Sequence, residues 1–280
     1  MVEKNRVNIL EIRKTKKKYG RFFLLTGVIC WFVVLVLLPV FGLVQEAVRS
    51  GTAVFIKSIL SPEFLRAFNL TLIITAGCVI FHTLFGIILA LVLVKRNFKC
   101  KLLLEGIIDL PFAVSPVVAG FMFLILFGPN GWIGNWFEAR HMKIVYAVPG
   151  MLIATLFVTF PFVVREVTPV LREFGIQQEE AAYVLGASKW QTFWKVTLPS
   201  IKWGMIYGVT LTVARAIGEF GAVLVVSGSI IGKTHTVTLH IHQEFTDFHY
   251  AGAYAAAIVL AFMSFTILTT MQFIGRMKGR

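Results

Sequence analysis

Residues 68–94 read FNLTLIITAGCVIFHTLFGIILALVLV, a run of 27 residues without Asp, Glu, Lys or Arg. A helix needs about 20 mostly apolar residues to cross the ~30 Å hydrocarbon core of a bilayer. Lipid offers no hydrogen-bond partners, so a crossing segment of this length must satisfy its backbone groups internally, as a helix does. The run therefore predicts a transmembrane helix in an integral membrane protein.

Five further windows of similar length extend this prediction along the chain. Residues 22–44, 144–164 and 251–275 also lack all four charged residue types, whereas 106–127 contains Asp109 and 203–228 contains Arg215 and Glu219. Hydrophobic residues make up 57% of the sequence and the mean hydropathy is +0.80, above the roughly 45–50% apolar content of ordinary globular domains. We expect an all-α integral membrane fold with six transmembrane helices.

Basic residues are distributed unequally between the two sets of loops. Of the 27 Lys and Arg residues, twenty lie before residue 22, in 95–105, in 165–202 or in the last five positions, and six lie in the alternate loops. Cytoplasmic loops carry such an excess. We predict a cytoplasmic tail over 1–21, a membrane domain over 22–275, a cytoplasmic loop at 165–202 and a cytoplasmic tail over 276–280. The net charge of +13 then reflects topology and contact with anionic lipid, and nucleic-acid binding is not expected.

The predicted cytoplasmic loop contains a polar stretch that is compatible with helix. Glu179 and Glu180 would lie in the first turn of a helix, where the helix dipole favours acids. Gly186 offers a stop, Ser188 can cap a second short helix, and Pro199 is expected to close it. The alternative is an amphipathic helix lying at the lipid headgroups, and the two interpretations are compatible because they use different faces.

This stretch resembles the signature of permease subunits of binding-protein-dependent ABC importers, E-A-A-x3-G-x9-I-x-L-P. The match comprises Glu180-Ala181-Ala182, Gly186 and Val196-Thr197-Leu198-Pro199, with Val196 in place of Ile. The resemblance implies the type I importer permease fold and a coupling helix over 179–199 that docks on a separate cytoplasmic ATPase. The implied coupling residues are Glu179, Glu180, Ala181, Ala182, Leu185, Gly186, Leu198 and Pro199.

A second resemblance concerns the cargo. Residues 109–120, 214–223, 225–228 and 232–234 look like the oxyanion-importing branch, and most like the W-type permease subunit of sulfate/thiosulfate importers. This resemblance implies transport of sulfate or thiosulfate across a bacterial inner membrane, with molybdate or tungstate as the alternative. It also implies a second, T-type permease subunit, an ATPase dimer that binds ATP and Mg²⁺, and an extracytoplasmic sulfate-binding protein; a homodimer of this chain remains open.

Charged residues and prolines inside the predicted spans are the candidate path residues. Arg215 and Glu219 are four apart, so they can pair on one helix face. They form either an ion pair that braces a helix contact or, through the guanidinium of Arg215, part of the translocation path. Pro111 and Pro116 predict a bend or a gate in the third span. Asp109 is expected to reach water or Lys101.

Two other features carry no chemistry in our interpretation. The segment Gly232-Lys233-Thr234 ends like a phosphate-binding loop, but Ser227 replaces the required first glycine. The four histidines in 229–250 do not form a convincing metal set, although His240 and His242 would share one face if that segment were a strand. We expect no nucleotide, cofactor or metal on this chain and no enzymatic activity of its own; an ATP-independent channel or a membrane-embedded enzyme is the remote alternative.

Overall fold

The computed structural model describes residues 23–277, and the side chains up to residue 273. The regular secondary structure of the described residues is entirely helical, with no strand among them. The chain divides into two compact units, residues 1–55 and 56–280, each of which is described by itself. The first unit contains η1 (Val33–Leu37) and α2 (Leu38–Arg49). Helix α3 (Thr52–Ile59) begins in the first unit and ends in the second. The predicted tail over 1–21 lies outside the described residues.

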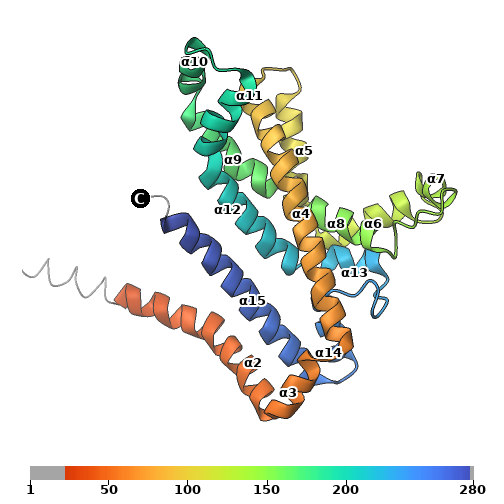
Figure 1. Ribbon diagram of the computed structural model, residues 1–280. Helices are drawn as coiled ribbons and strands as arrows, with labels where there is room; N and C mark the ends of the chain where they lie inside the picture. Colours follow the sequence, from red (N-terminus) through yellow and green to blue (C-terminus); the bar gives the residue numbers. More distant parts are fainter. Residues whose placement is uncertain (1–22, 278–280) are drawn as a thin grey trace, which may run out of the picture. The chain divides into compact units, whose positions relative to one another are not determined.

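The second unit contains the other helices (Figure 1). In chain order they are α4 (Pro62–Lys95), α5 (Lys101–Ala113), α6 (Pro116–Phe127), α7 (Gly134–Glu138), α8 (Val148–Thr159), α9 (Pro161–Phe174), α10 (Gln177–Val184), α11 (Lys189–Thr192), η2 (Phe193–Thr197), α12 (Leu198–Ile217), α13 (Gly221–Ser227), α14 (Val237–Thr246) and α15 (Tyr250–Met277).

The helices account for the predicted membrane spans. Four are long and apolar enough to cross a bilayer: Phe23–Arg49, Pro62–Lys95, Val148–Phe174 and Tyr250–Phe273. Two bent pairs, Lys101–Ala113 with Pro116–Phe127 and Lys189–Ile217 with Gly221–Ser227, bring the number to six if each pair is one span. The prediction of an all-helical membrane protein is therefore confirmed. The third and fifth spans are not single straight helices, because they bend by 111° and 54°.

The loop expected over 165–202 is shorter in the structure. Helix α9 continues to Phe174, and α12 begins at Leu198. The continuation of α9 is amphipathic, since Val167, Thr168 and Leu171 at three- and four-residue spacing are all buried. This buried stripe extends the helix beyond the end of the charge-free window, so that Arg165 lies within the helix rather than in a loop.

Helices α4, α9 and α12 pack together as the centre of the second unit. Their shared core contains Ile87 and Ala90 of α4, Val163 and Val167 of α9, and Ile201 of α12. Glycines allow the close approach, as small residues do in membrane helix pairs. A β-carbon at position 208 would lie 2.7 Å from the Cα of Val163, and one at position 86 would lie 2.8 Å from the Cγ1 of Val163. Helix α9 thus packs closely against α4 at Gly86 and against α12 at Gly208.

We expect Gly208→Ala to lower the thermal stability of the purified protein, because the added methyl group would overlap the α9 backbone. Overpacking of this kind costs about 1–3 kcal/mol. The matched control is Gly106→Ala in α5, where an added β-carbon meets nothing within 4 Å and the alanine favours helix by about 0.5–1 kcal/mol. Melting curves of the two variants in detergent would contradict the packing scheme if Gly208→Ala were as stable as Gly106→Ala.

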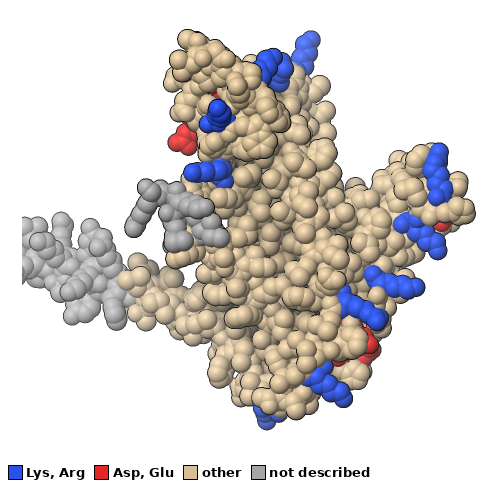
Figure 2. Space-filling model, viewed as in Figure 1, with Lys and Arg blue, Asp and Glu red and all other residues tan. Residues whose placement is uncertain are grey.

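The two ends of α4 carry different structures. At its Lys95 end lies the segment α10–α11, and at its Pro62 end α14 packs against α4 and α15 (Figure 1). A helix of 34 residues is about 50 Å long at 1.5 Å per residue, which is long enough to hold these structures on opposite sides of a bilayer. In Figure 2, Lys and Arg gather near α10–α11 and along the right and lower sides, with a largely uncharged region between them.

Candidate functional site

Helices α10 and α11 form an elbow at one end of the second unit. Helix α10 ends at Val184, and the chain turns at Gly186, whose φ of +85° favours glycine. Ser188 then starts α11 with a capping box: its hydroxyl accepts from the N–H of Gln191 at 3.3 Å, and the Gln191 side chain accepts from the N–H of Ser188 at 2.9 Å. The structure thus contains the elbow that the sequence predicts.

Pro199 does not close the second helix of the elbow, and the expectation that it would is wrong. The chain is helical without interruption from Lys189 to Ile217, with the π-helical turn η2 just before the proline. Pro199 lies in the first turn of α12, where its missing N–H is tolerated more easily than in a regular helix interior. The elbow is therefore continuous with the α12 span.

Glu179 connects the elbow to two other elements. Its side chain is buried, with 6% of its surface exposed. Both carboxylate oxygens accept from the Nζ of Lys95 at 2.6 Å, and the Thr197 hydroxyl donates to Oε1 at 2.5 Å. Lys95 is the last residue of α4 and Thr197 the last of η2. One carboxylate therefore joins α10 to the ends of the α4 and α12 segments.

The outer surface of the elbow is apolar and exposed. Val184 and Leu185 have exposed fractions of 88% and 87%, and Trp190 is also exposed. Of the other predicted coupling residues, Glu180, Ala181, Gly186 and Pro199 are exposed, and Ala182 and Leu198 are half-buried. Leu198 packs against the core of α4, α9 and α12. Exposed apolar groups outside the membrane spans are typical of protein contact sites.

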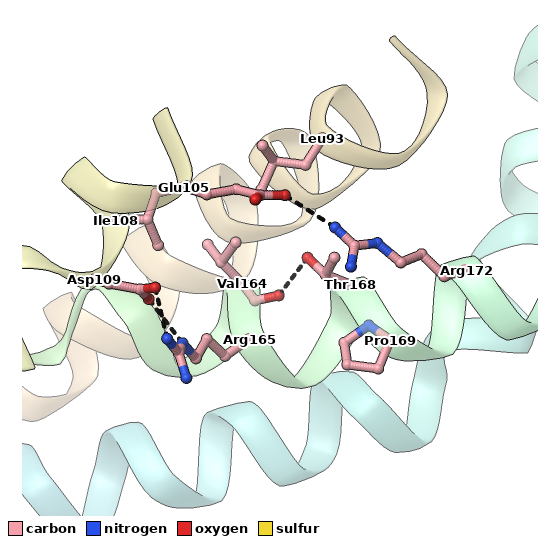
Figure 3. A pocket seen from close by; sticks show the side chains of 9 residues that line it. All are labelled: Leu93, Glu105, Ile108, Asp109, Val164, Arg165, Thr168, Pro169 and Arg172. Atoms are coloured by element: carbon pink, nitrogen blue, oxygen red, sulfur yellow. Dashed lines mark hydrogen bonds and ion pairs between the residues drawn. The ribbon is translucent and has the colours of Figure 1, made fainter. Parts of the chain in front are cut away.

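A pocket of about 280 Å³ lies between α5 and α9 (Figure 3). Two ion pairs connect the helices there. Arg165 binds Asp109 through Nε and Nη2, at 2.7 and 2.6 Å, and the Nη2 of Arg172 binds Glu105 at 2.9 Å. The floor includes Ile108 of α5. The ion-pair partner of Asp109 is thus Arg165 and not Lys101, because α9 carries its arginine alongside α5. The expectation that the carboxylate reaches water holds, since its side chain is partly exposed.

These ion pairs lie on a face that is open in the single chain. Arg165 is 57% exposed and Asp109 38% exposed. Charged groups within membrane-spanning segments face protein or water rather than lipid. The α5–α9 face is therefore directed toward another protein or toward an aqueous path. Glu105, Arg165 and Arg172 were not predicted as site residues, because they lie outside the charge-free windows, in segments expected to be loops.

The two prolines of the third span lie on either side of its bend. Pro111 is inside α5 and buried, and Pro116 is the first residue of α6. Gly221 of α13 lies against Pro116: a β-carbon there would be 3.1 Å from the Cβ of the proline. The bend is thus packed against the start of α13, a contact that favours a fixed shape over a free hinge.

Arg215 and Glu219 form an ion pair at the break in the fifth span. The Nη1 of Arg215 lies 2.6 Å from Oε2 of Glu219, although without an aligned hydrogen bond to that oxygen. Oε1 of Glu219 accepts from the N–H of Ala222 at 2.9 Å, and its backbone carbonyl accepts from the Thr238 hydroxyl at 2.7 Å. Glu219 is buried and Arg215 partly exposed. The pair braces the junction of α12, α13 and α14.

Two glycines, Gly218 and Gly221, lie close to this pair in the sequence, and they differ in how closely they pack. Gly221 contacts α6, whereas Gly218 has only the carbonyl of Ala214 in its own helix within 4 Å of an added β-carbon. Gly218 is the C-cap of α12. Its contribution is to end the helix, which places Glu219 at the break.

Most of the second unit matches a known family. Residues 82–276 match the model of the binding-protein-dependent transport system inner membrane component. The chain belongs to this family.

Relatives that match along most of the chain are sulfate transport system permease proteins. The chain is 44% identical over 97% of its length, and 98% of the relative's, to the sulfate transport system permease protein CysW of Synechocystis. It is 42% identical to CysW of Escherichia coli, over 89% of this chain and 86% of that one. It is 37% identical to CysT of Escherichia coli, over 92% and 94%.

Solved structures share the fold. A chain of a bacterial alginate ABC transporter, in complex with its pentasaccharide-bound periplasmic protein, superimposes with a TM-score of 0.80 over 94% of this chain and 96% of that one. The sequence identity is 20%. The type I importer permease fold expected from the sequence is therefore confirmed, and permease subunits of this family are not themselves enzymes.

Proposed function

We propose that the protein is a permease subunit of an ATP-driven importer that moves sulfate or thiosulfate into a bacterial cell. The choice of sulfate or thiosulfate as the substrate rests on the 44% identity to a CysW sulfate permease along nearly the full length of both chains. Coupling to a separate ATPase is assigned to the elbow over residues 179–199. Both termini and the elbow are cytoplasmic, the orientation favoured by the distribution of basic residues.

The partners follow from this assignment. An ATPase dimer, which binds the ATP and Mg²⁺, docks on the exposed apolar surface of the elbow. A paralogous T-type permease completes the path, a pairing supported by the similarity of this chain to both CysW and CysT. An extracytoplasmic binding protein delivers the anion on the opposite side.

The contacts of Glu179 supply a route from the ATPase to the membrane. When the ATPase moves the elbow, the carboxylate of Glu179 transmits the displacement to Lys95 of α4 and Thr197 of η2. Because α4 and α12 both pack on α9, the three central helices shift together. Access then changes from one side of the membrane to the other.

The experiment that tests this function is uptake by a strain lacking the chain and complemented with it. We expect ATP-dependent uptake of labelled sulfate, inhibited by excess thiosulfate, and co-purification of a separate ATPase. Uptake of molybdate in preference to sulfate would overturn the substrate. Anion conductance by the chain alone, without ATP, would overturn the transporter class.

The pocket between α5 and α9 gives a second test. We expect Asp109→Arg or Arg165→Asp alone to lower sulfate uptake by about tenfold, because each leaves like charges facing one another across the pocket. The double exchange restores the pair and most of the uptake. Protein stability should change little, about 0–1 kcal/mol, because the pair is partly exposed. Full uptake by both single variants would show that the pair has no part in transport.

A further inference from the structure

A cavity of about 220 Å³ lies at the end of the second unit opposite the elbow. One wall is the first third of α4, and the other is the turn that leads into α14. Its polar lining consists of Arg66, Asn69, Lys233 and His235, and its apolar lining includes Leu70 and Ile73. Under the orientation proposed above, this cavity opens on the extracytoplasmic side.

The turn that forms one wall is held by its own hydrogen bonds. The Thr234 hydroxyl donates to the carbonyl of Ser227 at 2.7 Å and accepts from the N–H of Ile230 at 3.1 Å. The N–H groups of Lys233 and Thr234 both donate to the carbonyl of Ile230, at 3.0 and 2.9 Å. The backbone of this wall is therefore held in place before any ligand arrives.

Glycine at position 232 brings Arg66 onto this turn. Gly232 has a φ of +77°, and a β-carbon there would lie 3.1 Å from Nη1 of Arg66. The guanidinium of Arg66 thus lies directly against the backbone of Gly232, next to Lys233 in the sequence. The cavity lining holds these two cations and no carboxylate, and neither cation forms an ion pair with a carboxylate within the part of the chain that the structure describes.

His235 is an unsatisfied polar group in the cavity wall. It is 4% exposed, and neither ring nitrogen has an aligned hydrogen-bond partner among the described residues. Burial, and to a smaller extent the neighbouring His240, lower the pKa of His235 to about 4, with a smaller opposing contribution from the backbone of Leu239. The ring is therefore neutral near pH 7, with one N–H to donate. A buried polar group without a partner costs about 1–3 kcal/mol, which a ligand that accepts a hydrogen bond would recover.

We propose that this cavity is a binding site for a small doubly charged oxyanion, in which Arg66 and Lys233 supply the charge and Asn69 and His235 supply neutral donors. A guanidinium presents paired N–H groups that match the oxygens of a tetrahedral anion. The cavity has room for such an anion with a few waters, each of which occupies about 30 Å³ in the liquid. The inference deepens the proposed function, on which it rests: the site holds the anion at the outer mouth before it enters the path.

The test is equilibrium binding of labelled sulfate to the full-length protein in nanodiscs, without binding protein or ATP. We expect Arg66→Gln and Lys233→Gln each to weaken binding by about tenfold, and the double variant by about a hundredfold. Arg66→Lys should retain part of the affinity. The matched control is Lys143→Gln, an exposed lysine of another extracytoplasmic loop that is outside the cavity, and it should bind as the unaltered protein does. If the double variant binds sulfate as tightly as the unaltered protein, the cavity is not the binding site and the proposal fails.

Two further outcomes would show that Arg66 and Lys233 bind a different anionic group. If the protein binds no sulfate but retains phosphatidylglycerol in native mass spectrometry, and the double variant loses it, the ligand is a lipid phosphate and the proposal fails. If the double variant binds sulfate normally but loses affinity for the extracytoplasmic binding protein, the cations hold an acidic side chain and the proposal also fails. Import of sulfate by a protein without this binding would leave the proposed function intact.

Discussion

Replacing Val184 and Leu185 together by aspartate is expected to abolish association with the ATPase and ATP-dependent uptake. These side chains are among the most exposed apolar groups of the protein, and they lie at the end of α10, beside the turn of the elbow. Burial of a Val or Leu side chain contributes about 1.5–3 kcal/mol, and a buried unpaired carboxylate adds a further cost. The loss of affinity should exceed a hundredfold in a pull-down or a titration.

The control for this prediction is Leu185→Met, which preserves the apolar surface and should retain the ATPase. The elbow itself should remain folded in the aspartate variant, because neither residue contributes to the core or to the capping box of α11. Undiminished ATPase binding by the double aspartate variant would show that docking uses a different surface.

Glu179→Ala is expected to loosen the elbow and to uncouple ATP hydrolysis from transport. The substitution removes a buried carboxylate that binds Lys95 and Thr197. A hydrogen bond to a charged group contributes about 1.5–3 kcal/mol; Lys95 is partly exposed, so we expect about 2 kcal/mol, or roughly a thirtyfold faster opening. Hydrogen exchange of the amides at 177–192 would measure this change.

The neighbouring glutamate supplies the control. Glu180 is exposed, with no hydrogen bond or ion pair of its side chain among the described residues, so Glu180→Ala should leave the exchange rates of the elbow unchanged. Any effect of Glu180→Ala on uptake would then arise at the ATPase. Equal protection of 177–192 in the Glu179→Ala variant and the unaltered protein would contradict the role given to the Lys95 contact.

Much of the fold could be predicted from the sequence because lipid imposes strong local rules. Charge-free windows locate the spans, and Gly186 with Ser188 locates the elbow, because a left-handed turn and a helix cap each need particular residue types. The break at Gly218 was not predicted because apolar residues continue on both sides of Arg215 and Glu219, so that 203–228 reads as one span. The uninterrupted helix at Pro199 was missed because it follows a π-helical turn that composition does not reveal.

Contacts between distant residues could not be predicted from local patterns. Lys95 and Glu179 are 84 positions apart, and Asp109 and Arg165 are 56 apart. Both pairs depend on the register in which helices pack, and that register follows from glycine contacts such as Gly208 on Val163. Arg215 and Glu219 could be paired from the sequence because their spacing is local. The hydrogen bond from the N–H of Ala222 to Glu219 at the start of α13 could not be predicted, because the break between α12 and α13 was not predicted.

Transport in a purified system tests the central claim most directly, namely that the elbow over 179–199 couples a separate ATPase to anion import. The measurement is labelled sulfate uptake into proteoliposomes that contain the complex, with the binding protein on one side and ATP on the other. Uptake should require both components and should stop in the Val184→Asp/Leu185→Asp variant, although the permease itself remains folded. Uptake that continues without ATP, or in that variant, would contradict the account.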